Sequence, residues 1–320
     1  MLDSGAWLRP QRTAMARGRG RRLAGNGKGS QDSTQAEGRS VGRASQGKSR
    51  KSLSGGGLMQ GAFLQQDRVA TGSVASAQAT IATMPITNLQ DPQPRRRARL
   101  MGSSATITAD LGAEVPVDCV ALISTTLGAG AMVQARLSNA ANFSVTLADT
   151  GLLNAEAQDE SQGHVVLVLP APVTARYLRI DLTDGAVPYM DIGLLVAGQL
   201  WRLLRGTAYG IREGRVMLDR RDRNPYTGAE FPVPAIVNPR MAAFTLPALS
   251  TAEARNQHRE MLRRLGAARD TLWIAELTDS MAERNRRAIW GAMNAPGEDA
   301  AISRDSLPLA SRGFRMVERV

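Results

Sequence analysis

Histidine and cysteine are scarce in this chain of 320 residues, which contains two histidines and one cysteine. One cysteine and two distant histidines cannot supply the three or four ligands of a zinc site. His258 falls on the apolar face of a predicted helix and His164 opens a predicted strand, so we expect both to be packing residues and no histidine-based triad to form. The sequence therefore predicts no catalytic residues, no metal site and no cofactor, and hence no enzyme.

Long apolar runs are also missing. No segment approaches the roughly 20 apolar residues that span a bilayer, so we expect a soluble chain without membrane insertion. The single cysteine, Cys119, lies inside an apolar strand and excludes an intrachain disulfide. We interpret it as a small core residue, which fits synthesis in a reducing cytoplasm.

Basic charge is concentrated at one end. The net charge is +11, yet residues 1–57 hold twelve Lys and Arg against three acidic residues, leaving about +2 for the rest. This Gly/Ser/Arg-rich segment has few apolar residues, so we predict a disordered tail over 1–58. Several interpretations stay open: a basic arm that binds nucleic acid or an acidic partner through counterion release, a flexible tail, or upstream translated sequence with the true start at Met59 or Met15.

Short alternating segments follow, punctuated by Gly, Pro, Asn and Asp, as is typical of an antiparallel all-β domain. The expected strands are 106–111, 117–123, 132–137, 164–169, 177–182 and 191–197. Several strings among them resemble the galactose-binding-like, or discoidin-type, jelly roll of bacteriophage tail proteins. They are Ala105-Thr-Ile-Thr-Ala-Asp-Leu-Gly112, Ala175-Arg-Tyr-Leu-Arg-Ile-Asp-Leu182 and the closing strand Ile192–Gly198.

This resemblance implies a β-sandwich over 59–200. Beyond residue 200, the sequence predicts a polar loop at 220–226 and further strands at 241–246, 271–275, 288–293 and 314–320. Ser250 and Glu253 form a capping box that opens a helix near 251–265, which Gly266 ends. The order of these elements in 201–320 resembles phage tail-tube and distal-tail ring proteins, which implies a smaller β domain with one helix that serves assembly.

Candidate ligand-binding residues come from the sandwich. Sugar sites place an aromatic face against the ring, and only four aromatics lie between residues 60 and 200. Tyr189 and Phe143 fall in or near loops, so they are the candidates for contact with a sugar, and packing against the protein is the alternative role for both.

Arg95, Arg96 and Arg97 form the densest charge cluster outside the basic tail. They would bind an acidic neighbour or an anionic glycan, or would form a solvated loop. Two groups are the nearest candidates for calcium ligands: Asp219, Asp222 and Asn224, which ion pairing with Arg220, Arg221 and Arg223 explains better, and the pair Asp181 and Asp184.

The resemblance makes a structural, non-enzymatic part of a phage tail tip or baseplate the leading hypothesis. Its partners would be other tail proteins, in a cyclic homo-oligomer of three or six copies, and its place would be the virion. The alternative is a carbohydrate-binding module that recognises host surface glycan. A third possibility is a cell-wall-degrading enzyme. It would need a pair of catalytic carboxylates, and no motif in the sequence identifies such a pair.

Overall fold

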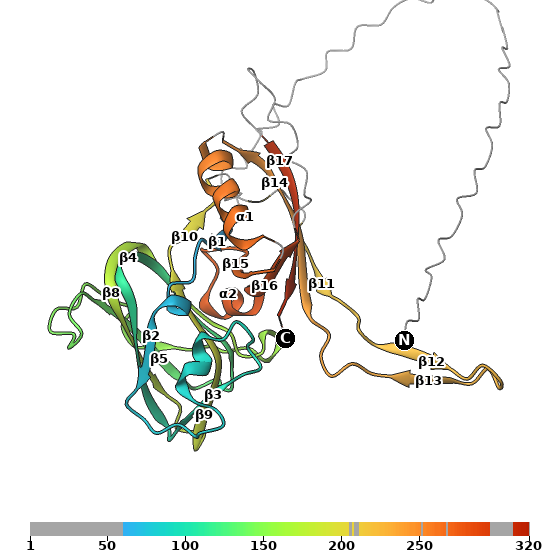
Figure 1. Ribbon diagram of the computed structural model, residues 1–320, viewed down its shortest axis with the longest axis horizontal. Coiled ribbons are helices and arrows are strands. Elements are labelled where there is room, and N and C mark those ends of the chain that lie inside the picture. The colour runs from blue at the N-terminus through green and yellow to red at the C-terminus, as the bar shows by residue number, and fades with distance from the viewer. Residues whose placement is uncertain are drawn as a thin grey trace, which may run out of the picture. The chain divides into compact units, whose positions relative to one another are not determined.

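The computed structural model describes residues 60–204, 207, 211–250, 252–266, 268–294 and 310–319. The predicted basic tail lies outside these residues. The described chain is mainly β, with two antiparallel sheets and a separate two-stranded hairpin (Figure 1). The antiparallel β-sandwich expected from the sequence is confirmed.

The sandwich is a sheet of eight strands in which every pairing is antiparallel. The path runs β3-β9-β4-β8-β5-β6, with β2 paired to β4 and β7 to β5. The strands are β2 (Ser73–Ser76), β3 (Ala98–Met101), β4 (Ser104–Thr125), β5 (Met132–Ser138), β6 (Ala148–Asp149), β7 (Leu153–Asn154), β8 (Val165–Thr183) and β9 (Tyr189–Gly198). Short 3-10 helices, η1 (Val69–Thr71), η2 (Ile86–Gln90) and η3 (Asp159–Ser161), lie in the connections.

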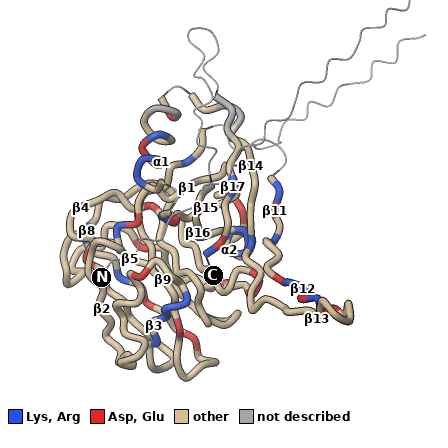
Figure 2. The backbone as a smooth tube through the Cα atoms, turned by 45° about the vertical axis from the view of Figure 1, so that its right-hand side comes forward, with Lys and Arg blue, Asp and Glu red and all other residues tan. Residues whose placement is uncertain are grey.

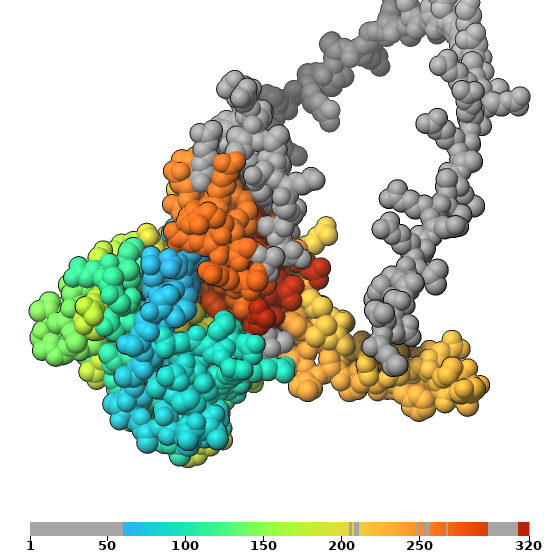
Figure 3. All heavy atoms as spheres, in the orientation of Figure 1, coloured from blue at the N-terminus to red at the C-terminus, as the bar shows by residue number. Residues whose placement is uncertain are grey.

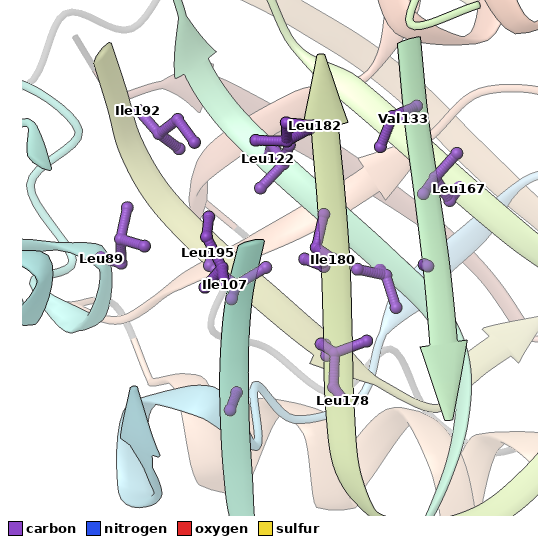
Figure 4. Packing of buried hydrophobic residues seen from close by; sticks show 14 of the residues in the cluster. Leu89, Ile107, Leu122, Val133, Leu167, Leu178, Ile180, Leu182, Ile192 and Leu195 are labelled. Carbon is purple, nitrogen blue, oxygen red and sulfur yellow. The ribbon is translucent and has the colours of Figure 1, made fainter. Parts of the chain in front are cut away.

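In two places, a pair of strands predicted from the sequence forms one long strand in the structure. The segments 106–111 and 117–123 belong to β4, and 164–169 and 177–182 belong to β8. Register shifts between Asp110 and Val115 and between Val117 and Cys119 explain the misreading, because a bulge bends a strand without ending it. The bend lets a single strand serve both layers of the sandwich, whose leucine, isoleucine and valine side chains meet inside (Figure 4).

The pattern of burial along β4 shows where one face of the strand is covered and where both faces are. From Ser104 to Leu111 buried and partly exposed residues alternate, as for a strand with one covered face. From Val117 onward nearly every residue is buried, because the second face packs on the other sheet. Cys119 lies in this doubly covered stretch, which confirms it as a core residue, and burial raises the pKa of its thiol.

The second sheet has seven strands in the order β10-β1-β15-β16-β17-β14-β11. Its first strand in the chain, β1, comes before the sandwich and pairs with β10, which directly follows it. The sandwich is therefore inserted into the second sheet, so the division expected at residue 200 leaves β1 on the other side. The strands are β1 (Ala62–Leu64), β10 (Leu200–Arg202), β11 (Arg212–Arg215), β14 (Arg240–Leu249), β15 (Asp270–Ile274), β16 (Ile289–Asn294) and β17 (Ala310–Glu318).

Helical turns cover this sheet. The capping box is confirmed: Glu253 N donates to Ser250 Oγ at 3.2 Å, and Ser250 N donates to Glu253 Oε2 at 3.1 Å. The helix begins as a π-helix, η4 (Glu253–His258), continues as α1 (Arg259–Leu265) and ends at Gly266 with φ +54°. A second helix, α2 (Met281–Arg287), was not expected, because seven residues are too few to show apolar periodicity.

Two further cores join these parts. Five aromatic rings pack together on the second sheet, from Phe63, Trp201, Phe244, Trp273 and Phe314. His258 is buried beside them, 5.5 Å from the Phe314 ring centroid, which confirms its packing role. A third apolar cluster contains residues of both sheets, so it packs the sandwich against the second sheet.

A hairpin, β12 (Arg220–Arg223) and β13 (Glu230–Val233), lies between β11 and β14 and pairs with neither sheet (Figure 1). The polar loop expected at 220–226 is thus partly a strand. Asn224 builds the turn, because its side chain accepts from the Tyr226 and Thr227 amides, and Gly228 supplies the required positive φ of +71°.

Candidate binding groove

The two aromatic candidates are far apart along the sandwich. Tyr189 opens β9 just beyond the Thr183 end of β8, whereas Phe143 lies in the loop that follows Ser138. Ser138 pairs with Tyr177, and Met132, at the other end of β5, pairs with Thr183. The two loops therefore leave the sheet in opposite directions, and the structure does not bring these rings into one site.

Tyr189 has a local partner instead. The guanidinium carbon of Arg99 lies 3.9 Å from the Tyr189 ring centroid, and Arg99 makes a bidentate ion pair with Asp191 at 2.7 Å. The ring face is thus occupied by a cation that is itself fixed. A sugar ring would have to displace this contact, so the packing interpretation of Tyr189 gains support.

The three predicted arginines have different roles. Arg97 is partly buried and donates to Ser124 Oγ at 3.0 Å, and the exposed Arg96 pairs with Asp91 at 2.9 Å. Arg95 is exposed, and no hydrogen bond or ion pair of its side chain occurs within the described ranges. The loop is held on the sandwich by Gly193, whose missing Cβ would lie 2.2 Å from the Pro94 carbonyl oxygen.

A groove of about 930 Å³ lies beside that loop, between the sandwich and the second sheet. One wall comes from residues 65–71, the loop at 90–93 and Leu194 of β9. The other comes from the end of α1, residues 268–270, Trp290 of β16 and Arg319 after β17. Figure 3 shows the blue atoms that begin the sandwich lying directly against the orange atoms of the helical region. This volume fits an oligosaccharide-sized ligand.

Four glutamine side chains line the groove. The hydrogen bonds that two of them make within the protein determine whether each offers a donor or an acceptor to a ligand. The Gln90 amide nitrogen donates to the carbonyl oxygens of Val69 and Gly72, which leaves the Gln90 carbonyl as an acceptor. Gln66 accepts from Arg264 at 3.2 Å, which leaves the Gln66 amide hydrogens as donors. The groove therefore presents both donors and acceptors, as hydroxyl groups require.

Asp67 is the carboxylate on the sandwich wall. Its Oδ1 accepts from the amides of Val69 at 3.0 Å and Ala197 at 3.2 Å. Burial raises the pKa of Asp67 to about 6, against the lowering effect of those backbone hydrogen bonds. Near neutral pH this carboxylate is therefore close to titrating.

The opposite wall is rich in arginine. Arg263 and Arg264 share the single carboxylate of Glu260, which these two guanidiniums hold at a pKa of about 2. Arg319 pairs with Asp270 at 2.8 Å. Arg269 is exposed, and its side chain makes no hydrogen bond or ion pair in the part of the chain that the structure describes. Figure 2 shows the basic residues along α1 and its end.

Trp290 contributes an aromatic side chain to the groove while being almost fully buried. Its indole Nε1 is also buried and has no hydrogen-bond partner among the described residues. An indole N–H normally finds a partner when it is buried. Trp290 is thus both a contact residue of the groove and a spectroscopic reporter within it.

A buried polar cluster elsewhere contains a serine, a histidine and a glutamate. The imidazole of His164 accepts at Nδ1 from the backbone amide of Ser124, and its Nε2 lies 3.5 Å from Glu318 Oε1. Burial and the nearby Arg240 lower the pKa of His164 well below its ordinary value. The serine hydroxyl accepts from Arg97 and not from the imidazole, and all three residues are buried. The arrangement is that of a structural cluster.

The carboxylates weighed as calcium ligands have protein partners. Asp222 lies 3.5 Å from Arg220, as the predicted ion pairing requires, and Asp181 pairs with Arg136 and Arg179. No group of three or more metal-ligating side chains occurs among the residues described. In the same ranges, no helix is long and apolar enough to cross a membrane.

Sequence reasoning missed the groove because its two walls come from residues some 200 positions apart, such as Gln66 and Arg264. One local signal was present, since Gln65 and Gln66 are adjacent and Gln90 and Gln93 recur nearby. The predicted arginine cluster is connected to the site, because the loop that carries it also supplies Gln90, Pro92 and Gln93 to the groove.

Comparison with known proteins gives similarity only to solved structures. No family model and no curated protein matches the chain. Chitosan-binding module 1 of a chitosanase/glucanase from Paenibacillus sp. IK-5 is 14% identical, with a TM-score of 0.35 over 42% of this chain and 99% of that chain. The lectin domain of lectinolysin complexed with Lewis B antigen is 14% identical, with a TM-score of 0.34 over 42% of this chain and 96% of that chain.

A Streptococcus pneumoniae fucose-binding module is 12% identical, with a TM-score of 0.34 over 42% of this chain and 94% of that chain. At such identities and TM-scores, these similarities do not establish what this chain binds. None of the three structures is a phage tail protein, so that part of the resemblance stays a prediction. The chain is similar, over about two fifths of its length, to carbohydrate-binding modules with the galactose-binding-like fold.

Proposed function

We propose that this protein binds carbohydrate and that the groove between the sandwich and the second sheet holds the saccharide. The observation that carries the proposal is the composition of the groove: four glutamines, two carboxylates, arginines and a tryptophan around about 930 Å³. Saccharide hydroxyls each donate and accept, so they are matched by amide side chains, which also do both.

A glycan array probed with the full chain would test whether saccharide is retained, and calorimetry on the best hit would give its affinity. Gln66→Ala and Gln93→Ala should each weaken binding about fivefold, since a net hydrogen bond contributes about 1 kcal/mol. Gln134→Ala is the matched control, because Gln134 lies on β5 and bonds Asp149, outside the groove. Retention of no saccharide would reject the proposal.

The same assay decides between the groove and the loop sites predicted from the sequence. Tyr189→Ala and Phe143→Ala should leave the affinity unchanged if the groove is the site. Loss of binding in either variant, with the glutamine variants unaffected, would move the saccharide to one end of the sandwich.

Binding without catalysis is part of this proposal. Both histidines are buried, and the two groove carboxylates, Asp67 and Asp270, are engaged by backbone amides and by Arg319, which supports it, because a general acid or base must reach its substrate. Incubating the bound glycan with the protein and analysing its length by chromatography tests the point. Shortening of the glycan would contradict it.

A second candidate function is that of a structural subunit, such as one in a phage tail tip or baseplate within the virion. The hairpin β12–β13 favours it. Within the described ranges its strands pair only with each other, and an isolated two-stranded hairpin is marginally stable in water. Tyr226 is 95% exposed and Ile236 92% exposed, with Met217, Leu218 and Phe231 also open to solvent. A neighbouring subunit that covers this arm would account for both features.

Light scattering and electron microscopy of the full chain test the assembly role. A ring of three or six copies that dissociates in the Tyr226→Ser/Ile236→Ser variant would support it. Val145→Ser is the matched control, because Val145 is an exposed apolar residue on the sandwich, outside the arm. A monomer at all concentrations would count against self-assembly.

A further inference from the structure

We infer that the groove selects acidic saccharides, whose carboxylate groups pair with Arg269 in its helical wall and with Arg95 on the loop beside it. This inference rests on the proposed function and adds the class of ligand. It starts from the arginines around the groove, which outnumber the carboxylates that neutralise them.

The helical side has an uncompensated positive charge. Arg263 and Arg264 share one carboxylate, and both bond it at 2.7 Å, so one charge of that trio is in excess. Arg269 adds another, since no described acidic side chain pairs with it. Asp270 is already occupied by Arg319 through two hydrogen bonds of 2.8 and 3.0 Å.

The sandwich side repeats this pattern at a smaller scale. Arg95 and Arg96 lie on the loop whose Gln93 reaches the groove, and the backbone amide of Arg96 donates to the Gln93 carbonyl. Arg96 is neutralised by Asp91, while Arg95 has no such partner among the residues that the structure describes. A chain lying in the groove would therefore meet the available guanidinium of Arg269 in the helical wall, and a chain that extends past Gln93 would reach the loop that carries Arg95.

Guanidinium groups match the geometry of carboxylates, because both are planar and can form two parallel hydrogen bonds. The groove also contains Asp67, which repels a carboxylate placed beside it but accepts a hydrogen bond from a hydroxyl, so we expect the ligand's hydroxyls at Asp67 and its carboxylates at the arginines. A polysaccharide with carboxylates on its sugars offers both groups. Nucleic acid instead needs open aromatic faces for its bases, and the one aromatic of the groove, Trp290, is almost fully buried.

Oligogalacturonate and its carboxyl-reduced counterpart, which has the same length and hydroxyls but no charge, form a matched pair of probes. The full chain should bind the acidic form about tenfold more tightly at low salt, and this difference should shrink as ionic strength rises. Quenching of tryptophan fluorescence that is lost in Trp290→Phe would place the acidic probe in the groove.

Arg269→Gln and Arg95→Gln should each weaken oligogalacturonate binding roughly five- to tenfold and leave the reduced form unaffected. Arg221→Gln is the control for charge, because Arg221 lies on the exposed hairpin away from the groove. Thermal melting of each variant confirms that it is folded.

Equal affinity for the two probes, with saccharide still bound, would overturn the acidic class while the proposed function stands. Binding of neither probe, nor of any array glycan, would reject both. Oligothymidylate that binds as tightly as oligogalacturonate would show that charge alone decides affinity and would overturn the inference. Unchanged affinity in both arginine variants would overturn it too.

Discussion

Replacing Glu318 by glutamine should destabilise the fold by about 3–5 kcal/mol, since it removes the partner of a buried arginine. Glu318 ends β17 and Arg240 begins β14, and both are buried. Arg240 Nε lies 3.0 Å from each carboxylate oxygen of Glu318, and the Arg240 backbone amide donates to the same group at 3.0 Å. The pair therefore joins two neighbouring strands by side chain and main chain.

The magnitude follows from what remains after the substitution. Arg240 still donates to the carbonyl oxygens of Ala288 and Arg286, but its positive charge would be buried without a counterion. The new amide would also point hydrogens at guanidinium hydrogens. Breaking a buried pair by removing one partner typically costs 3–5 kcal/mol, whereas an exposed pair contributes about 0–1 kcal/mol.

Urea unfolding at pH 7, followed by circular dichroism, measures the difference. Glu283→Gln is the matched control, because Glu283 pairs with Arg286 at 2.6 Å but both side chains are 46% exposed. We expect its free energy of unfolding to fall by less than about 1 kcal/mol. A loss below about 1 kcal/mol for Glu318→Gln as well would refute the reasoning, since Arg240 would then find water or another partner.

The remaining predictions concern single groups. Between about pH 4 and 6 the folded state binds more protons than the unfolded state at Asp67, because the folded pKa of about 6 exceeds the ordinary 3.8. The free energy of unfolding therefore falls as pH rises through this window, by at most roughly 3 kcal/mol. The loss is smaller where water in the groove screens the charge. Urea titrations at several pH values should show that Asp67→Asn lacks this loss. Asn285→Ala should cost about 1–3 kcal/mol in chemical unfolding, because it leaves the buried Val166 amide without its acceptor at 2.8 Å, and a loss near zero would mean that water replaces the asparagine. Gly193→Ala should cost about 2 kcal/mol or more and displace the loop at 90–97, since its Cβ would lie 2.2 Å from the Pro94 oxygen; an unchanged melting curve would contradict the close approach.

Local chemistry explains what could be predicted from the sequence. The Ser250 and Glu253 capping box and Gly266 mark both ends of a helix because each interaction spans only a few residues. Strand positions in the sandwich follow from alternating burial, which is also a local pattern. The predicted strand boundaries were wrong in β4 and in β8, where bulges join two predicted strands into one, because a bulge has no strong sequence signal.

The tertiary structure alone decided the rest, because it depends on residues far apart in the chain. Ala62 to Leu64 lie between β10 and β15, so the sandwich is an insertion, and no local pattern encodes that pairing. The groove likewise forms only where Gln66 meets Arg264 across nearly 200 residues. Composition and periodicity determined the β class and the scarcity of histidine and cysteine, whereas long-range packing determined which polar side chains converge on a ligand.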